Sequence, residues 1–199
     1  MKIKAIIILC ICTIFMFFII NNMESKNVLD TNVLLLPSLP RPIAKEYALI
    51  TSAGQSTEAY IINDIANKLM IHNYFMPQAR DTDLDGINTL VIVAGYSPLG
   101  EKLNGTAYEG EKLRIRKLLD KAKEKNLSVV TVYISGRGRR DKNTDELLTM
   151  IGPATNYFIG TKDSNEDGFL SALAKKNGTP LTLINGVNNI TEPFASAFR

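Results

Sequence analysis

Three arginines within four residues form the clearest chemical motif of the chain. They lie in the stretch Ser135-Gly-Arg-Gly-Arg-Arg140, which follows a run rich in valine. Guanidinium groups bind carboxylates and phosphates in a bidentate manner, and the two glycines allow a ligand to approach the backbone. We therefore expect Arg137, Arg139 and Arg140 to clamp a small anionic ligand. The alternative is a solvated basic loop whose charges pair with neighbouring aspartates.

A second candidate is the small polar stretch Ser52-Ala-Gly-Gln-Ser56. It lies between a short apolar run and an amphipathic pattern that begins at Thr57, which is typical of a buried parallel strand passing into a helix. Gly54 can adopt a backbone conformation that other residues avoid, and the first turn of a helix presents free N–H groups. The turn therefore suits a carboxylate or phosphate. The alternative is that Ser56 or Thr57 only caps the helix.

Two further loops carry polar side chains that could reach the same ligand. Tyr96 and Ser97 follow the predicted strand 89–94, in a stretch that we interpret as a flexible flap or as a connection without a role in binding. Asp163, Asn165 and Asp167 follow another predicted strand, and their oxygens could meet a cationic or hydroxyl group. The candidate ligand-binding residues are therefore Ser52, Gly54, Gln55, Ser56, Tyr96, Ser97, Arg137, Arg139, Arg140, Asp163, Asn165 and Asp167.

The sequence predicts neither a metal site nor a cofactor. The segments 81–86 and 163–168 begin like calcium-binding loops, but their twelfth positions, Ile92 and Ala174, cannot supply the required bidentate carboxylate. The single histidine, His72, is expected at the end of the first helix, away from the other candidates. This placement argues against a Ser-His-Asp triad and a histidine-based zinc site. Both cysteines, Cys10 and Cys12, lie in the N-terminal apolar run.

The N-terminal residues predict export. Lys2 and Lys4 precede the uncharged, mostly apolar run Ala5–Ile20, a charge order that holds the amino terminus in the cytoplasm. We interpret residues 1–22 as a signal peptide or membrane anchor, and the poor cleavage signal after Ile20 favours the anchor. Residues 23–43 read as a proline-containing linker, of which the apolar stretch Val33–Leu36 could lie on the domain, and 44–199 as one α/β domain. The expected location is the cell membrane, with the domain outside, or secretion.

Regular alternation of apolar runs and amphipathic stretches predicts the fold class. It is a single three-layer (αβα) sandwich with a mostly parallel sheet of five or six strands, flavodoxin-like or Rossmann-like, preceded by an N-terminal hydrophobic helix. In the long helix expected over 107–125, we place Leu113, Leu118 and Leu119 inward. We expect Asn143 or Thr144 to cap a helix over 145–151. The loops that follow the strands then share one rim of the sheet, where ligands of such folds bind.

Several short motifs, in this order, resemble an uncharacterised domain family. They are Thr51-Ser-Ala-Gly-Gln-Ser56, Val91-Ile-Val-Ala-Gly95, the Gly-x-x-Arg-Arg pattern within 136–140, and Asp167-Gly-Phe169. The resemblance spans about residues 43–198 and points to a domain of unknown function of exported proteins from clostridia-type bacteria. Its members carry a glycine-rich continuation where this chain has Ser97–Gly105. The resemblance implies the domain and no activity.

The leading functional hypothesis is therefore an exported domain that binds a small anionic ligand at the rim. Without the N-terminal 27 residues the formal net charge falls from +3 to about +1, so a nucleic-acid partner is not expected. The membrane is a partner through the N-terminal segment, and no protein partner is identified. One alternative is a hydrolase or transferase that uses Asp163 or Asp167 with a serine of the first turn. A further alternative is an envelope protein-interaction module.

Overall fold

The computed structural model describes residues 35–199. The predicted hydrophobic N-terminal helix and the first part of the predicted linker lie outside these residues. Residues 33–199 form one compact unit that holds every strand of the sheet and both hydrophobic cores. A unit with a complete sheet and its own cores can fold without the preceding segment. None of the helices within 35–199 has the length and apolar character that a membrane crossing needs.

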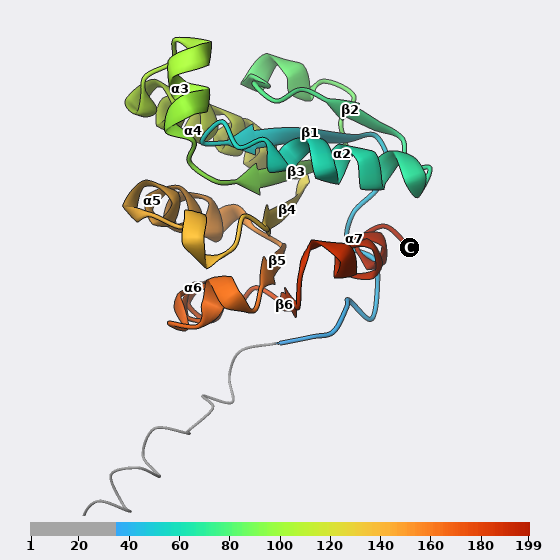
Figure 1. The fold of residues 1–199 in the computed structure, drawn as a ribbon. Helices are drawn as coiled ribbons and strands as arrows, with labels where there is room; N and C mark the ends of the chain where they lie inside the picture. Colours follow the sequence, from blue (N-terminus) through green and yellow to red (C-terminus); the bar gives the residue numbers. More distant parts are fainter. Residues whose placement is uncertain (1–34) are drawn as a thin grey trace, which may run out of the picture. The chain divides into compact units, whose positions relative to one another are not determined.

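Six strands form one sheet in which every neighbouring pair is parallel. Their spatial order is β2-β1-β3-β4-β5-β6, a flavodoxin-like order with a sixth strand added (Figure 1). The fold class predicted from the sequence is thereby confirmed. The strands are β1 (Ala48–Ala53), β2 (Asn73–Phe75), β3 (Thr89–Ala94), β4 (Ser128–Tyr133), β5 (Tyr157–Thr161) and β6 (Leu181–Ile184).

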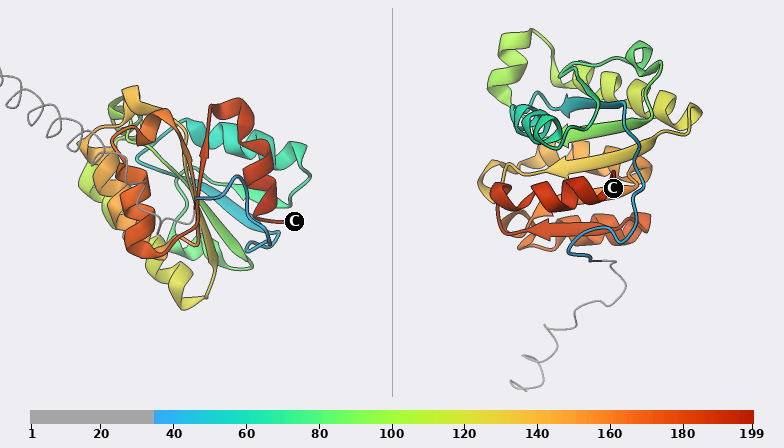
Figure 2. Two further views of the ribbon diagram at one scale, coloured as in Figure 1. Left: turned by 90° about the horizontal axis from the view of Figure 1, so that it is seen from below. Right: turned by 90° about the vertical axis from the view of Figure 1, so that its right-hand side faces the viewer.

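Helices cover both faces of the sheet, which explains why the central strands are buried on both sides. The left view of Figure 2 shows the sheet edge-on between two helical layers. One layer contains α2 (Glu58–Lys68) and α7 (Thr191–Ser196), and the other contains α4 (Tyr108–Glu124), α5 (Lys142–Ile151) and α6 (Phe169–Asn177). Strands enclosed in this way favour β-branched and other apolar residues at every position, as in Thr89–Ala94.

The chain reverses direction across the sheet between β1 and β3. After β1 it passes through α2 to β2 at one edge, and after β3 it passes through α4 to β4 and on to the other edge. The helices that follow β1 and β3 therefore lie on opposite faces, and in open α/β sheets the carboxyl ends of two such strands are the usual ligand site. Their register, with Ala53 opposite Ala94, places the loops that begin at Gly54 and Gly95 side by side.

Helix α4 buries the stripe Ile115, Leu118, Leu119 and Ala122, spaced as one face of a helix. Our prediction that Leu113 also points inward was wrong. Its side chain is 52% exposed. Leu113 lies five residues before Leu118, and this spacing turns it away from the buried face.

Two predictions of local structure were also wrong. The stretch that we interpreted as a flexible flap contains the helix α3 (Pro98–Asn104), which Ser97 caps by accepting a hydrogen bond from the Gly100 N–H at 3.1 Å. Helix α5 begins earlier than expected. Its cap is Asp141, whose carboxylate accepts from the Thr144 N–H at 2.8 Å, and neither Asn143 nor Thr144 has that role.

Residues 35–43, which we predicted to be linker, pack on the domain. The Leu36 N–H bonds to the Leu181 carbonyl at 2.9 Å and so extends the β6 edge. Leu39 is buried, and its N–H donates to the Ser196 hydroxyl at 3.0 Å. The Ile43 N–H donates to the Ala197 carbonyl at 2.9 Å. This segment therefore fastens α7 to the sheet.

Two leucines of α4 provide a matched test of the core. We expect Leu118→Ala, which empties a fully buried site, to lower the free energy of unfolding of residues 33–199 by about 2–5 kcal/mol. Leu113→Ala removes the same atoms from an exposed site and should cost about 0.5 kcal/mol or less. Urea denaturation measures both. Equal losses would contradict the observed packing of α4.

Candidate functional site

The backbone turn after β1 is occupied by a carboxylate of the chain itself. The Gly54 N–H donates to Glu111 Oε1 at 2.9 Å, and the Gln55 amide donates to Glu111 Oε2 at 3.0 Å. Glu111 comes from the first turn of α4. From the sequence we expected these groups to bind an external anion. The structure directs them to an internal one.

Glu111 forms a buried ion pair with Arg114. Their side chains are 3% and 13% exposed, and Arg114 Nη2 lies 2.7 Å from Glu111 Oε1 while Nε lies 2.8 Å from Oε2. Arg114 also donates to the carbonyls of Ser52 and Ala79, both at 2.6 Å. Buried charges are tolerated only when they are paired and hydrogen-bonded in this way. The pair therefore ties α4 to β1 and to the loop that follows β2.

The conformation of the first turn depends on Gly54. Its φ is +94°, and a Cβ at this position would lie 2.6 Å from the Gly95 carbonyl oxygen. Gln55 follows at φ +65°, and its side-chain oxygen accepts from Asn104 at 2.7 Å. The Asn104 contact draws the end of α3 onto the turn. Gln55 thus fastens α3 to the turn after β1.

Two other predicted residues also have structural partners, whereas the hydroxyl of a third has none. Tyr96 donates through its hydroxyl to Glu101 at 2.5 Å, and Ser97 caps α3 while its N–H bonds to the Gly54 carbonyl at 2.8 Å. Ser52 is buried on the same face of β1 as Ile50. Among residues 35–199 its hydroxyl has no hydrogen-bond partner.

A second carboxylate, Glu58, gathers polar groups from three loops at the carboxyl end of the sheet. We call Ser56, Glu58, Gly95, Ser135 and Arg139 the Glu58 cluster. The Ser56 hydroxyl donates to Glu58 Oε2, and Arg139 Nη1 donates to Glu58 Oε1 at 2.6 Å. A Cβ at Gly95 would lie 3.1 Å from the hydroxyl oxygens of both Ser56 and Ser135. Glycine therefore allows the loops after β1, β3 and β4 to converge there.

Glu58 is ionised at neutral pH. Burial raises the pKa of its carboxyl group, but hydrogen bonds from Ser56, Ser135 and its own N–H, together with the charge of Arg139, lower that pKa below its usual value overall. The carboxylate also lies in the first turn of α2, where the helix dipole favours negative charge. The cluster thus presents a fixed anion that orients Arg139.

The remaining two arginines are paired with acids of the next loop. Arg140 is only 11% exposed. Its guanidinium lies over the Phe169 ring, contacts Asp145 at 2.9 Å and bonds to Asp167 Oδ1 at 3.0 Å. Arg137 forms an ion pair with Glu166, and both side chains are exposed. The three arginines therefore do not converge on one point.

The acidic candidates brace the same loops. Asp163 accepts from the Ser164 N–H at 2.8 Å, and the Thr161 hydroxyl lowers the pKa of its carboxyl group. Asn165 accepts from the Ser171 N–H at 2.9 Å and so caps the start of α6. Asp167 binds Arg140. These contacts connect the loop after β5 to the loop after β4.

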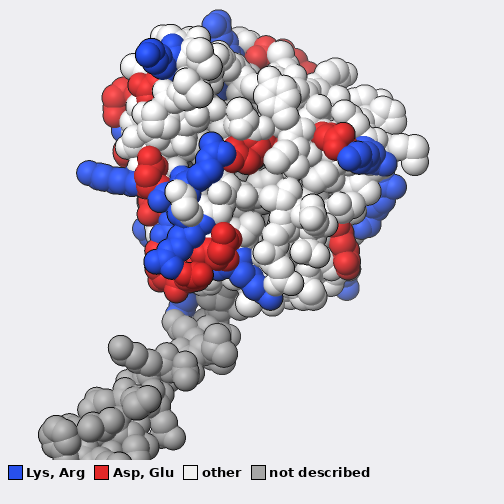
Figure 3. Space-filling model, in the orientation of Figure 1, with Lys and Arg blue, Asp and Glu red and all other residues white. Residues whose placement is uncertain are grey.

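Charges of both signs are interspersed over this part of the molecule. On the face drawn in Figure 3, blue and red side chains lie next to one another at the left, and no continuous basic surface is visible. Each of the three arginines has an acidic partner: Arg137 pairs with Glu166, Arg139 with Glu58, and Arg140 with Asp167. Arg139 stands apart because its side chain is 52% exposed while its partner is buried.

Sequence reasoning missed four residues that organise the site: Glu58, Glu111, Arg114 and Ser135. Glu58 and Glu111 lie in the first turns of predicted helices, where acidic residues commonly complement the helix dipole. Glutamate at these two positions therefore gave no indication of a further role. An available signal was the i,i+3 spacing of Glu111 and Arg114 on the margin of the apolar stripe of α4. Ser135 lies two residues after β4, in a position that parallel sheets favour for ligand contacts.

Metal and histidine chemistry find no support in the part of the chain that the structure describes. Residues 35–199 contain no group of three or more histidine, cysteine or acidic side chains arranged for a metal ion. His72 directly precedes β2, at the end of the sheet where the strands begin, and its Nδ1 lies 2.5 Å from a Glu46 carboxylate oxygen.

Removal of one partner of the buried pair should be costly. Glu111→Gln leaves Arg114 without a counter-charge, and we expect a loss of about 3–5 kcal/mol in the free energy of unfolding. Glu124→Gln on the same helix removes an exposed partner of Lys121 and should leave stability unchanged within error. Denaturant titrations compare the two variants. A loss for Glu111→Gln no larger than for Glu124→Gln would show that the pair does not hold the turn.

The Asp167–Arg140 pair predicts a specific acid dependence of stability. Hydrogen bonds from Arg140 lower the pKa of Asp167 to about 2, below its usual value. The pair therefore stabilises the fold fully above about pH 4, and this contribution disappears as the pH falls through about 2. We expect Asp167→Asn to lower the melting temperature at pH 6 and to match the unchanged protein near pH 2. A difference that grows as the pH falls would contradict this assignment.

Comparison with known proteins identifies the domain but not an activity. A family model described as a domain of unknown function (DUF6305) matches residues 45–198, close to the span of 43–198 expected from the sequence. Neither the curated proteins nor the solved structures contain a significant match. The model covers most of the chain and the whole sheet. The protein belongs to the DUF6305 family.

Proposed function

We propose that the domain binds a small ligand carrying a carboxylate or phosphate at the Glu58 cluster, with Arg139 as the recognising residue. One observation carries the proposal. Glu58, which is buried, holds the half-exposed Arg139 through Nη1 at 2.6 Å. Within residues 35–199 this is the only hydrogen bond of the Arg139 side chain, which is 52% exposed and keeps its other N–H donors unused.

Glu58 makes Arg139 a better receptor than a free surface arginine. A guanidinium has five N–H donors in a planar fork, and one contact to Glu58 leaves a complete edge for a bidentate anion. Because the carboxylate already restricts the side chain, ligand binding costs less rotamer entropy. Glu58 is therefore a positioning residue, and the ligand contacts Arg139.

The neighbours of Arg139 suit the same ligand class. Ser135 is half-buried two residues after β4, and its hydroxyl, which donates to Glu58, can still accept a hydrogen bond from a hydroxyl of the ligand. Arg137 is held only by Glu166 in an exposed pair, and such pairs contribute little stability, so Arg137 can turn towards a ligand. Gly54 and Gln55 are not part of this receptor, because Glu111 occupies their donors.

The geometry supports binding better than turnover. The hydrogen bond between Ser56 and Glu58 has the form of a nucleophile beside a base. However, the pKa of Glu58 lies below its usual value, which makes this carboxylate a weak proton acceptor. Asp163 and Asp167, the acid–base candidates of the alternative hypothesis, also have lowered pKa values and stabilise loops. A ligand-binding domain requires neither group to exchange protons.

We place this binding domain outside the cytoplasmic membrane. The support is the N-terminal sequence, in which Lys2 and Lys4 precede the apolar run Ala5–Ile20. The domain is then either anchored through this run or secreted. Fractionation of cells that produce the full chain tests the location, and recovery from the cytoplasmic fraction would contradict it.

Ligand binding is tested with residues 33–199 and a panel of inorganic phosphate, sugar phosphates, nucleotides and short carboxylates. A ligand that binds the native state raises the melting temperature by mass action. We expect one class to do so, and we expect Arg139→Ala to weaken its binding about 10- to 100-fold, as the loss of a charge-assisted contact implies. Glu58→Gln should weaken binding less, because Arg139 remains but is no longer fixed.

The matched control is Arg41→Ala, which removes an exposed arginine outside the cluster. It should leave binding unchanged. Arg140→Ala is unsuitable for this purpose because Arg140 is nearly buried and supports two loops. Unchanged affinity in Arg139→Ala, with the ligand still bound, would refute the assigned role of Arg139.

A further inference from the structure

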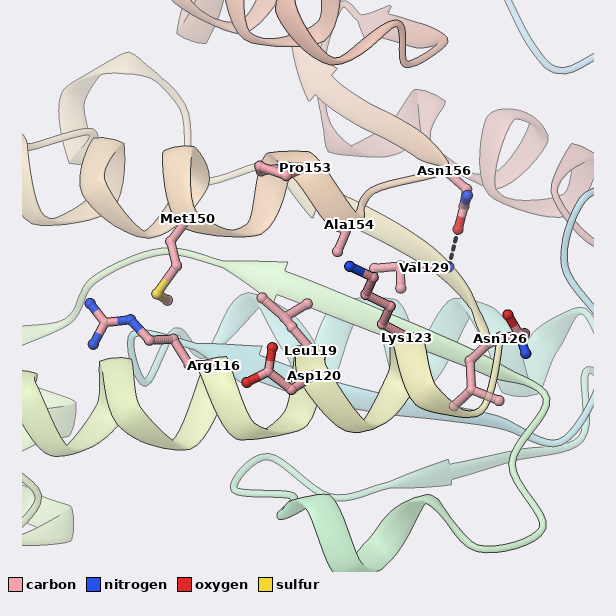
Figure 4. A pocket seen from close by; sticks show the side chains of 11 residues that line it. Arg116, Leu119, Asp120, Lys123, Asn126, Val129, Met150, Pro153, Ala154 and Asn156 are labelled. Atoms are coloured by element: carbon pink, nitrogen blue, oxygen red, sulfur yellow. Dashed lines mark hydrogen bonds between the residues drawn. The ribbon is translucent and has the colours of Figure 1, made fainter.

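A groove of about 540 Å³ lies between α4 and the segment that runs from the end of α5 to β5 (Figure 4). It is at the opposite end of the sheet from the Glu58 cluster, because Val129 near the start of β4 and Asn156 just before β5 contribute to its lining. The groove is therefore separate from the proposed site at the carboxyl ends of the strands.

The floor of the groove is apolar. Leu119 and Val129 are core residues whose outer surfaces reach the groove, and Met150, Ala154 and Leu127 pack against the same core. In Figure 4 the Met150 side chain points from α5 towards α4. An unbranched methionine adapts its shape readily to a bound apolar group. The volume lies within the range of small-molecule sites.

Two cations on α4 line the same groove without a partner. Among residues 35–199, the side chains of Arg116 and Lys123 form no ion pair or hydrogen bond, and Asp120 between them is also unpaired. They are seven residues apart, or about 10 Å along the helix axis. In Figure 4 Lys123 extends from α4 into the groove, and Arg116 marks one end of it. The three charged side chains that line the groove therefore carry a net charge of +1.

We infer that this groove binds a single-chain amphiphile with an anionic head, of the type of a medium-chain fatty acid. The alkyl chain would lie on Leu119, Met150 and Ala154, where it removes apolar surface from water. The carboxylate would pair with Arg116 or Lys123. Charge complementarity selects this occupant, because an uncharged chain would leave both cations unused and a cationic amphiphile would meet like charge.

The probe is decanoate, titrated below its micelle concentration into residues 33–199 and followed by isothermal calorimetry and amide NMR. We expect saturable binding and shifts at the amides of Leu119, Met150 and Ala154, whether or not decanoate also contacts Arg139. Shifts confined to Ser135 and Arg139 would assign decanoate to the Glu58 cluster and overturn the groove proposal. The absence of saturable binding would also overturn it.

Variants and a second probe test the contact of the ligand's head group separately from that of its alkyl chain. Arg116→Ala combined with Lys123→Ala should weaken decanoate binding about five- to tenfold, since exposed charge contacts contribute up to about 1 kcal/mol each. The control Arg41→Ala with Lys117→Ala removes the same charge outside the groove and should have no effect. Decanol should bind more weakly than decanoate. Equal affinity of the two probes, or of the two double variants, would refute the head-group contact.

A bulky substitution tests occupation of the groove itself. Ala154→Phe should abolish decanoate binding while the circular dichroism spectrum stays unchanged. If this variant does not fold, Met150→Glu, which places a negative charge beside the alkyl chain at a half-exposed position, should weaken binding instead. Full decanoate affinity in a folded variant of either kind would contradict the proposal. Binding to phosphatidylglycerol vesicles, without binding to free decanoate, would replace it with a membrane contact.

Discussion

The buried pair of Glu111 and Arg114 fixes the geometry of the carboxyl end of the sheet. Its carboxylate receives the N–H of Gly54 and the amide of Gln55, and its guanidinium holds the carbonyls of Ser52 and Ala79. Two charges with few water contacts are stable only if nearly all their hydrogen-bonding capacity is used, and here it is. The pair therefore determines the path of the chain from β1 into α2. It also determines which polar groups remain available to a ligand.

Two internal carboxylates take the places that an external anion would occupy at the first strand-to-helix turn. Glu111 satisfies the turn after β1, and Glu58 occupies the N-terminal end of α2. In open α/β sheets the crevice where the strand order reverses is the usual ligand site. We propose that recognition in this domain lies instead at the loop after β4, where the buried Glu58 holds the half-exposed Arg139. Of the three arginines in the motif, our proposal therefore assigns ligand recognition mainly to Arg139.

The fold was largely predictable because its signals are local. Each buried strand is a short apolar run, and the stripe on α4 follows helical spacing, so element types and their order could be read directly. The site was less predictable because its partners are distant in sequence. Glu111 lies 57 residues from Gly54, and Arg139 lies 81 from Glu58. Nothing near Gly54 indicates that its N–H faces a carboxylate from α4. The helix α3 was missed although Ser97-Pro98 and Gly105 are ordinary start and stop signals, because the glycines suggested a loop.

The most direct test is an amide NMR titration of residues 33–199 with the panel ligand that raises the melting temperature most. We predict shifts at Ser135, Gly136 and Arg139, with the backbone amide of Gly54 and the side-chain amide of Gln55 unchanged, because Glu111 keeps these two donors occupied. Shifts centred on Gly54 and Gln55 would contradict this prediction. They would mean that the ligand displaces Glu111 and binds at the turn after β1.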